Sequence, residues 1–176
     1  RPAGEYRGKP VYEADGLPSP CLFGLFSPAI YLTPGLEGDE REHVLAHEYT
    51  HFRQGDTGWA IWRGVLLALH WYNPLVWLAA HLSRRDCELS CDEGAVKLLG
   101  EERRADYGRT LVGLVTRKTA PADLLRCATT MTGGKSALKE RIALLVTRPR
   151  TTAAMAVLVA AACGLKIAKM SGRSLG

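Results

Sequence analysis

The chain has 176 residues, of which 47% are hydrophobic and 23% are charged, and its formal net charge is +5. This composition is typical of one globular domain with a buried core, and it excludes wholesale disorder. The basic residues are scattered and accompany no nucleic-acid-binding motif, so we expect no direct nucleic acid binding.

The chain begins with Arg1 rather than Met, and it shows no secretory leader, so we expect it to be a piece of a longer protein. Its five cysteines form no C-x-x-C pair. This pattern predicts reduced thiols in a reducing compartment, and neither a zinc ribbon nor a redox pair.

The first 34 residues predict strands and turns. Residues 11–15 are a strand candidate that is closed by turn residues. Residues 29–33 lie between Pro28 and Pro34. Prolines at both ends predict an edge strand, because an edge strand can spare the missing backbone donors.

The next segment predicts two helices. Asp39 followed by Glu42 is a capping-box pattern, which places a helix start at Asp39. This helix is expected to run to about Gln54, with Gly55 as its stop. A second, almost wholly apolar helix is expected over residues 59–72. We interpret it as buried or membrane-facing rather than as a membrane span, because arginine and histidine side chains interrupt the apolar run.

Three further helices are predicted downstream. Asn73 is a good N-cap, and Pro74 suits the first helical position, so a helix is expected from there to about Leu99. Two more helices are expected over residues 102–117 and 136–146. Proline and glycine residues mark the loops between them.

The segment His47-Glu48-Tyr49-Thr50-His51 is an H-E-x-x-H motif in the first predicted helix. Residues at i and i+4 share one helix face, so both imidazoles can reach one metal ion. Glu48 lies about 100° around the helix from His47, which suits a general base beside the open metal position. The motif therefore predicts a zinc site with His47 and His51 as ligands.

A catalytic zinc needs a third protein ligand and keeps one position for water. Glu88 lies on the helix that begins at Pro74, and Asp92 follows one turn later on the same face. Glu88 is therefore the candidate third ligand. Asp92 is a candidate for orienting a ligand histidine through a hydrogen bond.

Other possible ligands fit less well. His43 lies one turn before His47, but three collinear histidines cannot reach one ion, since the outer Cα atoms are ~12 Å apart. His43 is therefore expected to pack or to support a ligand. His81, two turns before Glu88, remains a weaker candidate. Cys87 and Cys91 are weaker still, because metalloproteases of this kind use nitrogen and oxygen ligands.

Several segments are similar to those of one known family. They are H-E-Y-T-H at 47–51, W-Y-N-P-L-V-W at 71–77 and R-D-C-E-L-S-C-D at 85–92, together with residues 19–32, Tyr107, Lys139, Arg141 and Ile142. In combination they resemble the metalloprotease domain of the antirepressor family, the bacterial β-lactam sensor and signal-transducer membrane proteins. The resemblance covers roughly residues 10–165.

The resemblance implies an α+β fold, a compact gluzincin-type zinc protease domain that is mostly helical with a small sheet near the N-terminus. We expect this domain over residues 1–150. Residues 151–176 are expected to be an apolar C-terminal segment that belongs to a transmembrane helix or a membrane-proximal tail. The resemblance also implies one Zn²⁺ per chain and these roles: His47, His51 and Glu88 as ligands, Glu48 as base, and Asp92 as a second-shell partner.

The resemblance further implies the protease domain of a membrane-bound bacterial signalling protein. Such a protein cleaves itself, a transcriptional repressor or both in response to an external signal such as a β-lactam. Residues 151–165 are uncharged and follow Arg148 and Arg150, so the positive-inside bias predicts that the protease domain faces the cytoplasm. Lys166, Lys169 and Arg173 on the far side of the run argue against this orientation. The run alone is shorter than the ~20 residues of a full span.

The implied reaction is peptide hydrolysis by a water that Glu48 deprotonates. An extra donor should stabilise the oxyanion, and Tyr107 is the candidate, because it lies on a later helix that can face the cleft. We expect an extended substrate to add to the predicted edge strand. The residues of that strand are Ala29, Ile30, Tyr31 and Leu32.

Two alternatives stay open. One is a free-standing soluble minigluzincin peptidase, against which the apolar run at 151–165 argues. The other is a zinc-stabilised interaction module without turnover. Glu48 argues against the module, since a structural zinc site needs no base and fills all four positions with protein ligands.

Overall fold

The computed structural model describes residues 1–17, 19–24, 26–118 and 134–147. The chain divides into two units, Arg1–Val146 and Thr147–Gly176. The sheet, the helices over residues 38–118 and the candidate site lie in the first unit. The apolar run predicted at 151–165 lies outside the described residues, and so does the predicted domain boundary at residue 150.

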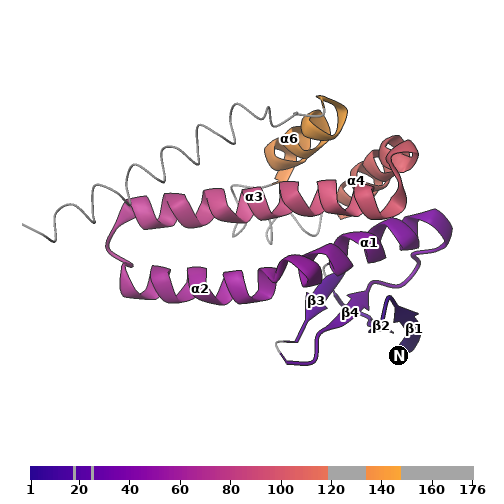
Figure 1. The fold of residues 1–176 in the computed structure, drawn as a ribbon, viewed down its shortest axis with the longest axis horizontal. Helices are drawn as coiled ribbons and strands as arrows, with labels where there is room; N and C mark the ends of the chain where they lie inside the picture. Colours follow the sequence, from indigo (N-terminus) through magenta and orange to yellow (C-terminus); the bar gives the residue numbers. More distant parts are fainter. Residues whose placement is uncertain (18, 25, 119–133, 148–176) are drawn as a thin grey trace, which may run out of the picture. The chain divides into compact units, whose positions relative to one another are not determined.

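Four short strands near the N-terminus form one sheet in the order β1-β2-β4-β3 (Figure 1). β1 (Pro2–Tyr6) and β2 (Lys9–Glu13) are antiparallel, β2 runs parallel to β4 (Ala29–Leu32), and β4 is antiparallel to β3 (Cys21–Phe23). The β1–β2 hairpin turns at Arg7 and Gly8, which have φ angles of 48° and 80°. Two successive positive φ angles are typical of a type I′ turn, whose twist matches that of the strands.

The prediction that residues 29–33 form an edge strand is wrong. β4 lies inside the sheet, with β2 paired on one side and β3 on the other. Pro28 and Pro34 flank the strand, so neither proline interrupts its ladder. Ile30 and Leu32 are buried in the core, as a central strand requires. Among the described strands on this side of the sheet, β3 is the outermost.

Helix α1 (Gly38–Gln54) contributes side chains to two apolar clusters. The first cluster joins it to the sheet and contains Val11, Ile30, Leu32, Leu36, Val44 and Leu45. The second joins it to the other helices and contains Ala46, Ala95, Val96, Tyr107, Leu111 and Leu145. Because α1 is packed on two faces, the side chains of its H-E-x-x-H segment have fixed directions.

The predicted capping box at the start of α1 is wrong. Glu37 is the N-cap residue, and it makes no side-chain cap bond. Asp39 and Glu42 instead accept hydrogen bonds from Arg103, at 2.8 Å and 2.7 Å. Arg103 lies in the 3₁₀ turn η1 (Glu101–Arg103), far along the sequence, so the competing partner was not visible from local spacing. The predicted stop is confirmed, since Gly55 adopts a left-handed φ of 72°.

Helices α2 (Asp56–Leu69) and α3 (Pro74–Leu99) form an antiparallel hairpin whose turn lies away from the sheet (Figure 1). Asn73 caps α3, as predicted, and its side-chain oxygen accepts from the Leu75 amide at 3.0 Å. α2 begins three residues earlier than predicted, and none of its residues is buried. Across the described residues, no helix has the length and apolar character that crossing a membrane requires.

Two further helices among the described residues belong to the α+β fold that we predicted. The helix expected over residues 102–117 begins as η1 and continues as α4 (Arg104–Lys118). The helix expected over residues 136–146 is α6 (Gly134–Thr147). Tyr107 and Leu111 of α4 and Leu145 of α6 pack against α3 and α1 in the second apolar cluster.

Gly94 sets the distance between α1 and α3. A Cβ atom at this position would lie 2.5 Å from Cγ2 of Thr50, which real Cβ atoms do not tolerate. The Thr50 side chain is itself fixed, since its hydroxyl donates to the carbonyl of Ala46 at 2.8 Å. This close approach brings Glu88 and Asp92 of α3 to the histidines of α1.

We therefore predict that Gly94→Ala lowers the free energy of unfolding by about 1–3 kcal/mol, the usual cost of overpacking a tight contact. Gly64→Ala is the matched control, because Gly64 is also helical and has nothing within 4 Å of an added Cβ. The control should be neutral or should stabilise the chain by about 0.5–1 kcal/mol. Urea unfolding followed by circular dichroism measures both. Equal effects of the two substitutions would contradict the packing argument.

Candidate metal centre

Three side chains from α1 and α3 bring their ligand atoms to one point. His47 and His51 lie one turn apart on α1, and Glu88 faces them from α3. Their ligand atoms all lie within 4.8 Å of one another. The two Nε2 atoms are 3.1 Å apart, and His47 Nε2 lies 3.7 Å from Glu88 Oε2. The structure thus brings together the three residues that the sequence predicted as ligands.

The hydrogen bonds around both histidines leave their Nε2 lone pairs facing each other. Tyr107 donates its hydroxyl hydrogen to Asp92 at 2.7 Å, so its oxygen accepts from His47 Nδ1 at 2.8 Å. Asp56 accepts from His51 Nδ1 at 2.7 Å. With a proton on each Nδ1, two lone pairs and the Glu88 carboxylate converge, which is favourable only around a cation. The donor set fits a divalent metal with nitrogen and oxygen ligands.

The charges around His47 favour the same conclusion. Burial lowers the pKa of His47, but its hydrogen bonds with Asp92 and Glu88 outweigh burial and raise that pKa to about 9. Burial raises the pKa of Glu88, but His47 and Arg141 outweigh it and bring that pKa down to about 2. The site therefore contains the ionised Glu88 carboxylate beside the His47 imidazole, which attracts positive charge, either a proton or a metal ion.

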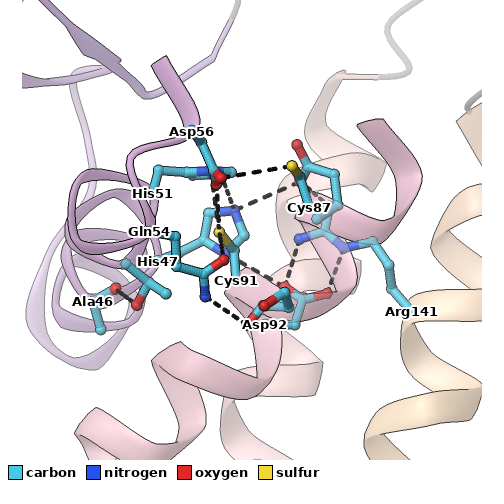
Figure 2. Close-up of polar contacts among 12 residues, drawn as sticks. Ala46, His47, His51, Gln54, Asp56, Cys87, Cys91, Asp92 and Arg141 are labelled. Atoms are coloured by element: carbon cyan, nitrogen blue, oxygen red, sulfur yellow. Dashed lines mark hydrogen bonds and ion pairs between the residues drawn. The ribbon is translucent and has the colours of Figure 1, made fainter. Parts of the chain in front are cut away.

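A buried network behind His47 holds this arrangement. Arg141 from α6 donates two hydrogen bonds to the Asp92 carboxylate, one to each oxygen and both 2.7 Å long (Figure 2). Its third nitrogen lies 3.4 Å from Glu88 Oε2. Burial raises the pKa of Asp92, but its hydrogen bonds with Arg141 and His47 outweigh burial and lower that pKa to about 2. Asp92 lies 3.3 Å from Nδ1 of His47, which is one of the two histidines predicted as ligands.

Tyr107 does not lie where an oxyanion donor would. Its side chain is 1% exposed, and its hydroxyl lies on the Nδ1 side of His47, away from Nε2. The hydroxyl hydrogen is engaged by Asp92 and the oxygen by His47. The expected oxyanion role is therefore corrected to a positioning role, in which Tyr107 links His47 to Asp92.

Asp56 and Cys91 contact His51. Sequence reasoning missed Asp56 and considered Cys91 only as a weak candidate for a metal ligand. Asp56 is the first residue of α2, and the turn at Gly55 folds it back against the last turn of α1. The Cys91 thiol lies 3.1 Å from both His51 Nδ1 and Asp56 Oδ2 (Figure 2). Burial raises the pKa of Cys91, which keeps it a thiol. The one available signal for Asp56 was an acidic residue directly after the predicted helix stop.

Glu48 and His43 occupy separate positions beside the histidine pair. Glu48 is 8% exposed and lines a cleft of about 590 Å³ together with His47, His51 and Glu88. His43 is buried, and its Nδ1 hydrogen-bonds the Thr110 hydroxyl at 2.7 Å. It does not belong to the group of converging ligand atoms, as its position one turn before His47 predicted.

The cleft lies between the outer strand of the sheet and the base of the α2–α3 hairpin. Pro20, Cys21 and Leu22 line it on the side of β3. Ala60 and Arg63 of α2 also line it, with further residues of α3. Residues of β3 and the histidine pair thus line the same cleft.

Comparisons with known proteins point to one family. The sequence pattern of the family described as "BlaR1 peptidase M56" matches residues 6–145. The chain is 29% identical to the regulatory protein BlaR1 of Bacillus licheniformis over 131 residues. The matched segment covers 73% of this chain and 22% of that protein. It is 24% identical over 133 residues to the methicillin resistance mecR1 proteins of Staphylococcus aureus and Staphylococcus epidermidis, covering 73% of this chain and 23% of each. The chain thus spans less than a quarter of the length of these relatives.

The placement of Tyr107 predicts the effect of Tyr107→Phe. Loss of the hydroxyl frees His47 Nδ1 and one Asp92 oxygen, so zinc affinity should fall about 10–100-fold, as for other partners of ligand histidines. Competition with a chromophoric chelator measures this affinity. Tyr72→Phe, at an exposed tyrosine in the turn after α2, is the control and should leave it unchanged. Full zinc affinity in Tyr107→Phe would contradict the positioning role.

Proposed function

The chain belongs to the BlaR1 peptidase M56 family, and we propose that it is the zinc-dependent endopeptidase domain of a membrane-bound signalling protein. One observation carries the proposal. The ligand atoms of His47, His51 and Glu88 converge within 4.8 Å, and Glu48 of the same helix lines the same cleft. A metal site with a carboxylate that is not itself a ligand suits hydrolysis better than a purely structural role.

His47, His51 and Glu88 would hold one zinc ion, which supplies a Lewis acid that polarises a peptide carbonyl and acidifies water. Three protein ligands leave one coordination position for water or substrate. The thiol of Cys91 does not join this set, because it lies on the Nδ1 side of His51. The proposed set of ligands therefore contains nitrogen and oxygen atoms and no sulfur.

Glu48 moves the proton in the proposed reaction. It follows His47 directly, so it lies about 100° around α1 and borders the cleft beside the histidine pair. In this position it accepts a proton from the attacking water and later passes it to the leaving amine. General-base assistance of this kind contributes about 10²–10⁴-fold to the rate.

The buried partners keep the ligand histidines in one tautomer. Asp92 and Tyr107 hold the proton of His47 on Nδ1, and Asp56 does the same for His51. Both Nε2 atoms are then free to act as ligands without rearrangement. Arg141 fixes the Asp92 carboxylate from behind, and in this way it ties α6 to the metal site.

We place an extended substrate on β3 instead of β4. β4 is hydrogen-bonded on both edges, so it has no edge to which a peptide can add. β3 pairs with β4 on one edge, and no described strand pairs with the other. Residues Cys21 and Leu22 of β3 also line the cleft. Backbone pairing along β3 would hold the scissile carbonyl near Glu48.

The names of the relatives support a signalling role. One is a regulatory protein, and the others are methicillin resistance proteins. We propose that the longer parent of this chain is a bacterial membrane protein whose protease domain faces the cytoplasm. Its substrates would be itself, a transcriptional repressor or both, and its stimulus an external signal such as a β-lactam. Tethering suits such a role, because it restricts cleavage to polypeptides that come to the membrane.

The zinc assignment predicts distinct effects for ligand and base substitutions. His47→Ala and Glu88→Ala should lose the bound zinc. Glu48→Gln should keep zinc and lose about 10²–10⁴-fold in peptide cleavage, because the base is not a ligand. Metal analysis and a fluorogenic peptide assay measure the two properties. His81→Ala, at an exposed histidine of α3, is the control and should keep both. Near-normal cleavage by Glu48→Gln would refute the assigned base, and an inactive wild type with full zinc would favour the non-catalytic module.

The strand assignment predicts where a bound peptide lies. A peptide carrying a photoreactive residue next to a non-cleavable bond should cross-link to β3, at residues 21–23, in the Glu48→Gln variant. Mass spectrometry of the digested product locates the cross-link. A peptide that cross-links instead to β1, the other outer strand, would exclude β3 as the substrate strand.

A further inference from the structure

Residues 57–83, which we call the apolar hairpin, expose an unusual amount of hydrophobic surface. They comprise most of α2, the turn, and the first part of α3. The exposed large apolar side chains are Trp59, Ile61, Trp62, Val65, Leu66, Leu69, Trp71, Tyr72, Leu75, Trp77, Leu78 and Leu82. Monomeric soluble proteins rarely expose contiguous apolar patches larger than a few hundred Å², so this surface requires a partner.

The outside of the apolar hairpin carries no charge. Arg63 is the one residue among 57–83 that is charged at neutral pH. Its guanidinium points to α3, where it donates to the Ser83 hydroxyl at 3.3 Å and to the Cys87 sulfur at 3.4 Å. A helix of a soluble protein normally keeps a polar face toward water, and α2 has none. A second protein would cover only one side of such a helix. Lipid would contact every side of α2 that the rest of the chain leaves exposed.

The aromatic residues of the hairpin favour a bilayer in particular. All four tryptophans of the chain lie in it, at positions 59, 62, 71 and 77, and all are exposed. Tryptophan and tyrosine are enriched at the level of the lipid headgroups. Exposed Arg53 and Arg84 lie just outside the hairpin on either side, where they can meet anionic headgroups.

Several polar groups of the turn are hydrogen-bonded within the hairpin, as an environment with little water requires. The indole nitrogen of Trp77 donates to the Trp71 carbonyl at 2.8 Å. The Asn73 amide donates to the His70 carbonyl at 2.9 Å, and the Asn73 side chain caps Leu75. Backbone groups that enter lipid must find such internal partners, because no water is available to satisfy them.

We propose that the apolar hairpin inserts into one leaflet of a lipid bilayer. α2 has 14 residues and is therefore ~21 Å long, which reaches into a leaflet but does not cross a hydrocarbon core of ~30 Å. Ala60 and Arg63 at the base of the hairpin also line the cleft. Insertion would therefore hold the cleft beside the membrane surface. This inference is independent of the proposed peptide hydrolysis.

Intrinsic fluorescence tests the proposal directly, because every tryptophan lies in the hairpin and none lies in residues 147–176. Vesicles of phosphatidylcholine and phosphatidylglycerol should shift the emission of the whole chain to shorter wavelength. Lipids brominated on the acyl chain should quench it. Binding through residues 151–165 alone would bring the chain to vesicles without quenching, and that result would overturn the proposal.

A double substitution sharpens the test. Leu66→Asp with Leu69→Asp should weaken vesicle binding more than about tenfold, since burial of one leucine side chain alone is worth about that much. Val146→Asp, at an exposed valine outside the hairpin, should leave binding unchanged. Zinc binding and circular dichroism check that both variants are folded. An emission shift that depends on protein concentration without lipid, with no quenching by brominated lipid, would show that a second copy covers the hairpin and would overturn the proposal.

Discussion

The buried carboxylate of Asp92 is the interaction on which the site depends. It is held by Arg141 from α6 and Tyr107 from α4, and it orients His47 on α1 from its own helix α3. A buried charge is costly unless it is paired and hydrogen-bonded, and here each oxygen of the carboxylate has such partners. The tautomer of His47 thus depends on the packing of four helices, and a change in that packing would reach the proposed metal site.

The sequence predicted those parts of the site that depend on local spacing. The i, i+4 relation of His47 and His51, the placement of Glu88 and Asp92 one turn apart, and the helix boundary at Gly55 all follow from helix geometry. Asp56 and Arg141 could not be assigned roles in the same way. Asp56 reaches His51 only because the chain reverses at Gly55, and Arg141 reaches Asp92 from a helix that is distant in sequence.

The errors have the same origin. Prolines on both sides of residues 29–33 suit an edge strand, but they equally suit a short central strand whose ladder ends before each proline. Asp39 and Glu42 match a capping box, but Arg103 offers both carboxylates a charged partner. In each case a tertiary contact overrode a local pattern. The result moves the proposed substrate strand from β4 to β3 and leaves helix α1, with the predicted ligands His47 and His51, where the sequence predicted it.

X-ray absorption spectroscopy of the zinc-loaded chain tests the central assignment most directly, because it identifies the atoms bound to the metal. A site formed by His47, His51 and Glu88 predicts two imidazole ligands and oxygen ligands near 2.0–2.2 Å, with no sulfur. His51, Asp56 and Cys91 form a second group that is able to hold a metal ion. A sulfur shell near 2.3 Å would place zinc in that second group and would contradict the account.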